Sequence, residues 1–108
     1  MYIFDLIRTS LKQVQMLGEK LKELRERNGM VQRKVAADLQ IDIAYISKME
    51  HNEKPVNRGH LLKLAHLYNI PESELIPIWL ADKVLDLIGN ENFKDQALEL
   101  ALIKAKIK

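Results

Sequence analysis

The sequence predicts an all-α protein, and three features of its 108 residues support this fold class. Apolar residues recur at spacings of three and four, which places them on one face of a helix. No stretch shows the strict alternation of apolar and polar residues that indicates a half-buried strand. Short polar segments at 28–29, 51–55 and 89–90 separate the apolar stretches. A chain of this length forms one small domain, or one domain with a short appendage.

The first three predicted helices are short and closely spaced. The first ends at Asn28-Gly29, because glycine suits the left-handed backbone that often closes a helix. The second begins near Gln32, and the third begins after Asp42, a favourable N-cap residue. The apolar faces consist of Leu17, Leu21 and Leu24 in the first helix, Val35, Ala36 and Leu39 in the second, and Ile46 and Met49 in the third.

Three further helices are expected in the second half of the chain. The fourth begins near Asn57, and Pro71 opens a fifth, which Pro77 either kinks or restarts. The fifth helix ends at 89–90, and a sixth runs from about Asn92 to the C-terminus. The apolar face of the fourth helix consists of Leu61, Leu64, Ala65 and Tyr68.

Composition narrows the possible functions. The chain has no cysteine, so disulfides, thiol catalysis and cysteine-bound zinc are excluded. Of the histidines His51, His60 and His66, the last two are six residues apart and do not converge on a helix, and no carboxylate pair supports a metal site. No nucleophile lies near a base in a recognisable motif. We therefore expect neither an enzyme nor a metal or cofactor protein. No apolar stretch approaches the ~20 residues that span a bilayer, and 1–8 does not resemble a signal peptide, which predicts a cytoplasmic protein.

The predicted helices over 18–69 form a helix-turn-helix arrangement framed by supporting helices. Its informative residues are Leu21, Leu24, Arg25, Gln32, Val35, Ala36, Leu39, Tyr45, Ile46, Ser47, Lys48, Met49, Glu50, Leu61, Leu62, Leu64 and Ala65. In this order and spacing they resemble the lambda-repressor-like, Cro/repressor-type (XRE) family of DNA-binding domains, over about 17–75. The resemblance implies double-stranded DNA as the partner, and an ion pair between Arg25 and Glu50.

The third helix has an outward face that suits a DNA groove better than water. Ile43 and Ala44 can contact thymine methyl groups, and Lys48 can donate to guanine. The resemblance implies the same base contacts, with Gln32 on a phosphate. The predicted DNA-binding residues are Gln32, Ile43, Ala44, Tyr45, Ser47, Lys48, Asn52, Lys54 and Arg58. Three alternatives remain: Ile43 as a core-edge residue, Tyr45 packed on its own loop, and Lys48 simply solvated.

Three residues depart from the family pattern. Val31 stands where Ser or Thr usually caps the second helix, and the loss of a cap costs about 1 kcal/mol. Gln40 stands where the turn usually has glycine, and a left-handed backbone there would cost roughly 1 kcal/mol. Asn52 also replaces a frequent glycine, but asparagine tolerates this conformation.

The chain after the predicted domain is unusually apolar. Ten of the fourteen residues in 75–88 are apolar, and they cover more than one face of a helix, so a second cover is needed. We favour a symmetry mate as this cover, while the sixth helix or 1–15 folding back is the alternative. The predicted dimer interface consists of Trp79, Leu80, Val84, Leu87, Phe93, Leu98 and Leu102.

Together these features predict three segments: a lead-in over 1–15, a DNA-binding domain over 16–76 and a dimerisation extension over 77–108. The predicted function is sequence-specific regulation of transcription by a homodimer on a palindromic operator, with no small-molecule effector evident. The resemblance implies a repressor-type regulator, with restriction-modification controllers closest in size, although the residues do not choose between repression and activation. The alternative function is a helical module that binds a protein, such as a toxin or a transcription factor.

Overall fold

The structure is a computed structural model that describes residues 16–107. The helix expected within 1–15 lies outside the described residues. In the described part every regular element is helical, as the sequence predicted. The elements are α2 (Leu17–Arg27), α3 (Gln32–Leu39), α4 (Ile43–Glu50), α5 (Arg58–Leu67), a 3₁₀ turn η2 (Glu72–Glu74), α6 (Ile76–Ile88) and α7 (Lys94–Ile107).

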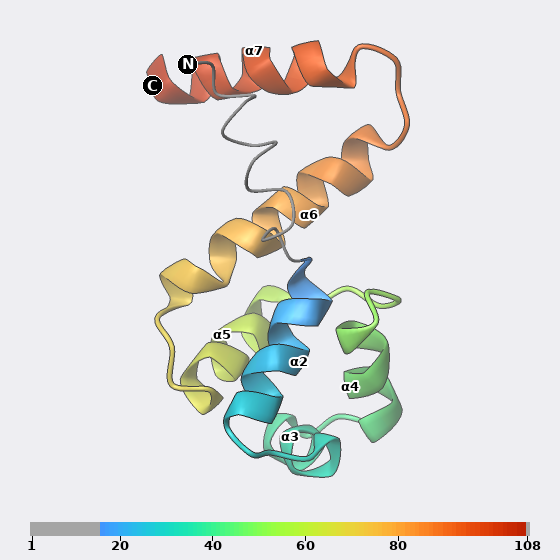
Figure 1. The fold of residues 1–108 in the computed structure, drawn as a ribbon, viewed down its shortest axis with the longest axis vertical. Helices are drawn as coiled ribbons and strands as arrows, with labels where there is room; N and C mark the ends of the chain where they lie inside the picture. Colours follow the sequence, from blue (N-terminus) through green and yellow to red (C-terminus); the bar gives the residue numbers. More distant parts are fainter. Residues whose placement is uncertain (1–15, 108) are drawn as a thin grey trace.

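Helices α2 to α5 gather around one small core, and α6 leads away from them toward α7 (Figure 1). The core contains the predicted apolar faces of the first four helices, together with Val56 and Leu75. Ala36 is buried where α3 packs against α4, so a small side chain lets the two helices approach closely. Helix α3 lies at one end of the molecule and α7 at the other (Figure 1).

Each of the four core helices ends in a residue with left-handed backbone. These residues are Gly29, Gln40, Asn52 and Asn69, with φ between 54° and 66°. After each one the next amide turns back to the helix, as Ile41 N does to Ala36 O at 3.0 Å. This is the arrangement that satisfies the last carbonyls of a helix. The sequence predicted three of these four ends, including the strained one at Gln40.

Helix starts follow the sequence less closely. Asn57 caps α5, because its side chain accepts a hydrogen bond from His60 N at 2.7 Å. Asp42 occupies the predicted N-cap position of α4 but makes no side-chain capping bond. Pro71 opens only the 3₁₀ turn, and Pro77 lies in the first turn of a separate α6. Of the two expectations for Pro77, the structure therefore shows a restart, because proline suits a first turn that needs no amide donor.

Helices α6 and α7 carry no fully buried side chain. The exposed large apolar residues of these helices and of the connection between them include Leu80, Val84, Leu85, Leu87, Phe93, Leu100, Leu102, Ile103 and Ile107. Within residues 16–107, α7 does not fold back to bury α6. We call the apolar surface of these two helices and their connection the arm surface.

Candidate DNA-binding surface

Helix α4 is held by one face and leaves the other open. Its inward residues Ile46 and Met49 are 1% and 2% exposed, and they anchor the helix against α2 and α3. Ile43, Ala44 and Lys48 all lie exposed on the opposite face. Ile43 is 48% exposed, so it is not a residue of the core edge. The structure thus brings the three predicted base-contacting residues onto one solvent-facing surface.

Two other α4 residues predicted to contact DNA are partly buried within the protein. Tyr45 is half-buried, and its hydroxyl donates a hydrogen bond to Pro55 O at 3.0 Å. Ser47 is also half-buried. Tyr45 therefore packs on its own loop, which was one of the two alternatives that the sequence left open, and we assign it a supporting role beside the exposed residues.

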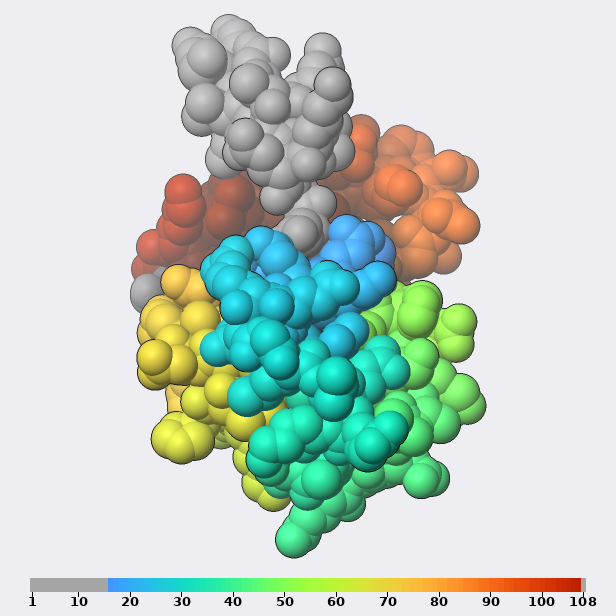
Figure 2. All heavy atoms as spheres, turned by 60° about the horizontal axis from the view of Figure 1, so that its bottom comes forward, coloured from blue at the N-terminus to red at the C-terminus, as the bar shows by residue number. Residues whose placement is uncertain are grey.

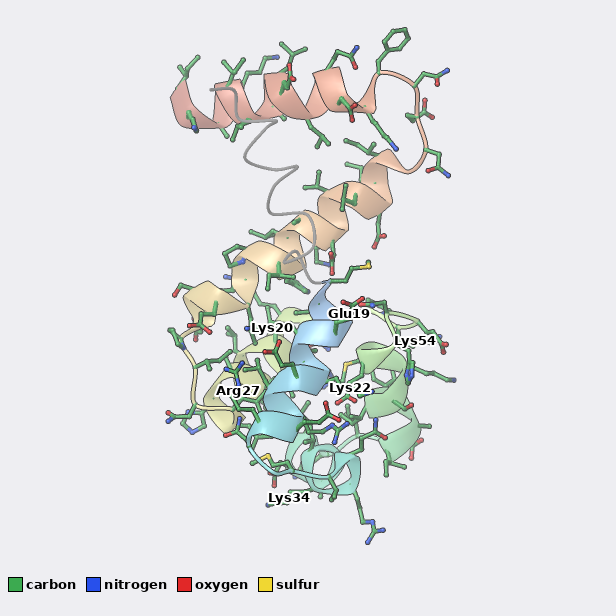
Figure 3. All side chains as sticks on the ribbon, viewed as in Figure 1. Glu19, Lys20, Lys22, Arg27, Lys34 and Lys54 are labelled. Atoms are coloured by element: carbon green, nitrogen blue, oxygen red, sulfur yellow. The ribbon has the colours of Figure 1, made fainter. Side chains whose placement is uncertain are left out.

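The loop after α4, residues 51–57, places further polar groups beside the open face. Its Asn52 side chain accepts a hydrogen bond from Gly18 N at 2.9 Å, which ties the loop to the start of α2. A Cβ atom at Gly18 would lie 2.6 Å from Asn52 Oδ1, Glu50 O and Met49 O, so only glycine fits this contact. Lys54 and Arg58 are exposed beyond it. In Figure 3, Lys54 projects from this loop next to the end of α4.

The first turn of α3 supplies two cations, Arg33 and Lys34, that are not among the residues predicted from the sequence. Arg33 and Lys34 are exposed directly after Gln32. Lys34 Nζ lies 2.9 Å from Asp38 Oδ1, an exposed pair one turn apart. In Figure 2, which brings the α3 end forward, α3 and α4 form one surface with α7 behind it. Arg33 and Lys34 directly follow Gln32, which was itself predicted to contact phosphate, and this position was the signal that could have identified them.

The Gln32 side chain, which was expected on a DNA phosphate, already has a hydrogen-bond partner within the protein. Its side-chain amide donates a hydrogen bond to Glu50 Oε1 at 3.0 Å, so the amide is drawn inward by a buried carboxylate. The sequence placed this amide on a DNA phosphate. The structure gives it a second partner inside the protein, because α3 begins beside the end of α4, where Glu50 lies.

Arg25 and Glu50 form the ion pair that the family resemblance implied. Arg25 Nε lies 2.7 Å and Nη2 3.1 Å from the two Glu50 oxygens, and Nη1 donates to Met30 O at 2.9 Å. The side chains are 12% and 3% exposed. The hydrogen bond from Arg25 to Glu50 raises the pKa of the guanidinium above its ordinary value. This pair joins α2, the start of α3 and the end of α4, and so fixes how the two helices of the motif meet.

Tyr68 lies in the core near this pair, and its titration should make stability depend on pH. Burial raises the pKa of the phenol above its ordinary value of 10.0, and the Glu50 carboxylate raises it further. The unfolded chain therefore loses this proton at a lower pH than the folded protein does. The contribution of Tyr68 to the free energy of unfolding is fully present below pH 10.0 and should be lost as the pH rises through the folded pKa.

Denaturant unfolding at a series of pH values below and above 10.0 would measure this loss of stability. Tyr68→Phe provides the control, because it keeps the ring but removes the titrating hydroxyl, and its stability should decline less steeply. An equal decline in both proteins would assign the effect to other groups, such as lysines.

The residues predicted for the dimer interface divide into two groups. Leu80, Val84, Leu87, Phe93 and Leu102 are exposed on the arm surface, and Leu98 is half-exposed. Trp79 instead faces the core, because its indole Nε1 donates a hydrogen bond to Val56 O at 2.6 Å. We therefore do not include Trp79 among the residues available to a partner.

Residues 16–107 offer no candidate for two other kinds of site. Across this part of the chain no group of three or more His, Asp or Glu side chains could hold a metal ion. Nor does any of its helices combine the length and apolar character needed to cross a membrane.

A small helical bundle that exposes the second helix of a helix-turn-helix motif to solvent is typical of DNA-binding domains. Comparison with known families agrees: a family described as a helix-turn-helix domain matches residues 18–78, more than half of the chain. The chain belongs to this family, which is of the XRE, lambda-repressor-like type. It is a family of DNA-binding regulator domains and not of enzymes. No solved structure matches the chain.

Proposed function

We propose that this protein is a sequence-specific transcriptional regulator that binds a palindromic operator as a homodimer. The observation that carries the proposal is the open face of α4, where Ile43, Ala44 and Lys48 are exposed while the opposite face is anchored in the core. Apolar side chains gain nothing from water on such a face, but they can contact thymine methyl groups in a major groove.

Backbone contacts would come from groups on both sides of α4. Lys54 and Arg58 follow the helix, and Arg33 and Lys34 precede it. Such cations fix a protein on the duplex without reading its sequence, so they supply affinity and register. Gln32 and Asn52 also lie here, although both already bond within the protein.

A second copy of the chain is the proposed occupant of the arm surface. Leu87 is 87% exposed and Phe93 is 76% exposed, and burying one such side chain contributes about 1.5–3 kcal/mol. One short recognition helix reads only a few base pairs, which is too few for a useful specificity ratio. Two α4 helices held by a two-fold axis, with centres about 34 Å apart, would contact half-sites one turn apart on the same face of the DNA. We therefore assign residues 77–108 to dimerisation.

Lys48→Ala tests the base-reading role of α4. We expect the variant to lose its preference at one operator position in each half-site, at a cost of about 1–3 kcal/mol there, because the lysine donates to a base edge. Lys54→Ala is the matched control: it should weaken binding to all sequences about equally, because a phosphate contact carries no sequence information. Selection of bound duplexes from a random pool, followed by titration of the selected site, measures both effects.

An unchanged selected motif for Lys48→Ala would contradict the proposed placement of α4. The wild-type titration also separates a regulator from a protein-interaction module. A regulator should lose affinity steeply with salt, with a log–log slope of about −0.9 for each phosphate contact. A module that uses the arm surface to bind another protein should bind neither the random nor any selected duplex.

A further inference from the structure

The 51–57 loop is held by hydrogen bonds from three different helices. Tyr45 of α4 donates to Pro55 O at 3.0 Å, and Trp79 of α6 donates to Val56 O at 2.6 Å. The third bond joins Gly18 N of α2 to the Asn52 side chain. The first part of the loop is also bonded to the end of α4, since Glu53 N donates to Lys48 O at 2.8 Å. Its second part, at Pro55 and Val56, is held by the two side-chain donors and by the burial of Val56 in the core.

Trp79 also contacts the cation that follows the loop. The Arg58 guanidinium carbon lies 5.7 Å from the centre of the indole ring, and Lys83 Nζ lies 4.6 Å from it. Cations at such distances are attracted to the ring by its quadrupole. One side chain of α6 thus orients both the Val56 carbonyl and the Arg58 head group.

One turn further along α6, Asp82 contacts α2, the helix that holds the other end of the loop. Its carboxylate accepts a hydrogen bond from Leu17 N at 3.1 Å, in the first turn of α2. A carboxylate is favoured there, because it meets unpaired amides and the positive end of the helix dipole. The next residue, Gly18, is the one that holds Asn52. Asp82 therefore fixes the start of α2 from which the loop is held.

Both packing and directional contacts hold the loop in position, since Val56 is 4% exposed in the core. A cavity of about 310 Å³ lies between the loop and α6, and its lining includes Pro55, Val56, Trp79, Asp82 and Lys83. Beside this open space, the directional contacts of Trp79 add to the packing of Val56 in setting the distance between α6 and the loop.

We propose that Trp79 is a positioning residue for DNA-backbone contacts: it holds the 51–57 loop and Arg58 in the orientation that meets the phosphates. This inference rests on the proposed function, because it assigns the loop and Arg58 to the DNA backbone. It gives α6 two roles on two faces, with Trp79 toward the DNA-binding domain and Leu80, Val84 and Leu87 on the exposed arm surface.

Trp79→Phe in the full-length protein tests the inference, because it keeps an aromatic ring beside Arg58 but removes the indole donor. We expect binding to a random-sequence duplex and to the selected operator to weaken alike, by about threefold to tenfold, as for one lost hydrogen bond. The salt dependence should become less steep by about 0.9 for each phosphate contact that is lost. Tyr45→Phe, which removes the neighbouring donor to the same loop, should show the same pattern.

Three controls separate positioning from general destabilisation. Denaturant unfolding must show that the variants are folded at the assay temperature, and sedimentation must show an unchanged oligomeric state. Trp79→Leu, which also removes the ring, should weaken binding further than Trp79→Phe because Arg58 loses its partner. If it does not fold, Trp79→Phe still decides the question.

If the affinity of the wild type falls steeply with salt and Trp79→Phe changes neither the affinity nor its salt dependence, the inference is overturned and the proposed function stands. A changed ratio of operator to random binding would also overturn it, because the effect would then act through the base-reading helix. A wild-type protein that binds neither duplex would refute the function and the inference together.

Discussion

Leu87→Glu is expected to convert the protein to a monomer and to weaken operator binding by about 100-fold to 10,000-fold, which is the gain from linking two binding units. Leu87 is 87% exposed on α6, so a charge there disturbs no core contact but would lie unpaired in a dimer interface. Leu80→Glu, at 48% exposure on the same helix, should act in the same direction.

The measurement combines sedimentation at micromolar concentration with operator titration. Ser73→Glu is the matched control, because it adds the same charge at an exposed position outside the arm surface and should change neither result. Circular dichroism should show that the helices of the DNA-binding domain remain folded in both variants. A wild-type monomer with full-strength operator binding would contradict the dimer and leave the arm surface to an intramolecular cover or to another protein.

Arg25→Met and Glu50→Leu are each expected to lower the free energy of unfolding by about 3–5 kcal/mol, because each strands a buried charge. Glu50 is 3% exposed on its side chain and would retain only the Gln32 amide after Arg25 is replaced. Small domains are stable by only about 5–15 kcal/mol, so either variant alone loses a large part of the total.

The double variant should be clearly more stable than the sum of the two losses predicts, because replacing both charges leaves neither unpaired. Arg27→Met provides the control. Arg27 pairs with Glu23 at 2.6 Å on the same helix, but the two side chains are 60% and 39% exposed, and such a pair is worth at most about 1 kcal/mol. Strict additivity of the Arg25 and Glu50 variants would show that their contact contributes no coupling energy.

Local signals in the sequence were sufficient to locate the helices of the DNA-binding domain and their buried faces. Leu17, Leu21 and Leu24 repeat at helical spacing, and all three are buried. The end at Gly29 followed from the residue type, because few residues other than glycine and asparagine tolerate a positive φ. The Arg25–Glu50 pair was accessible only through the resemblance, since nothing local relates residues 25 positions apart.

The sequence by itself also determined which residues of α4 face outward, because the periodicity of a short helix separates its two faces without reference to the rest of the chain. Only the tertiary structure decided which of those polar and aromatic groups are already engaged. Trp79 was predicted at a dimer interface but bonds to Val56, 23 residues away. Gln32 donates to Glu50 across 18 residues, and Asp82 reaches Leu17 across 65. A hydrogen bond depends on where two elements meet in space, and periodicity along one element carries no information about that meeting.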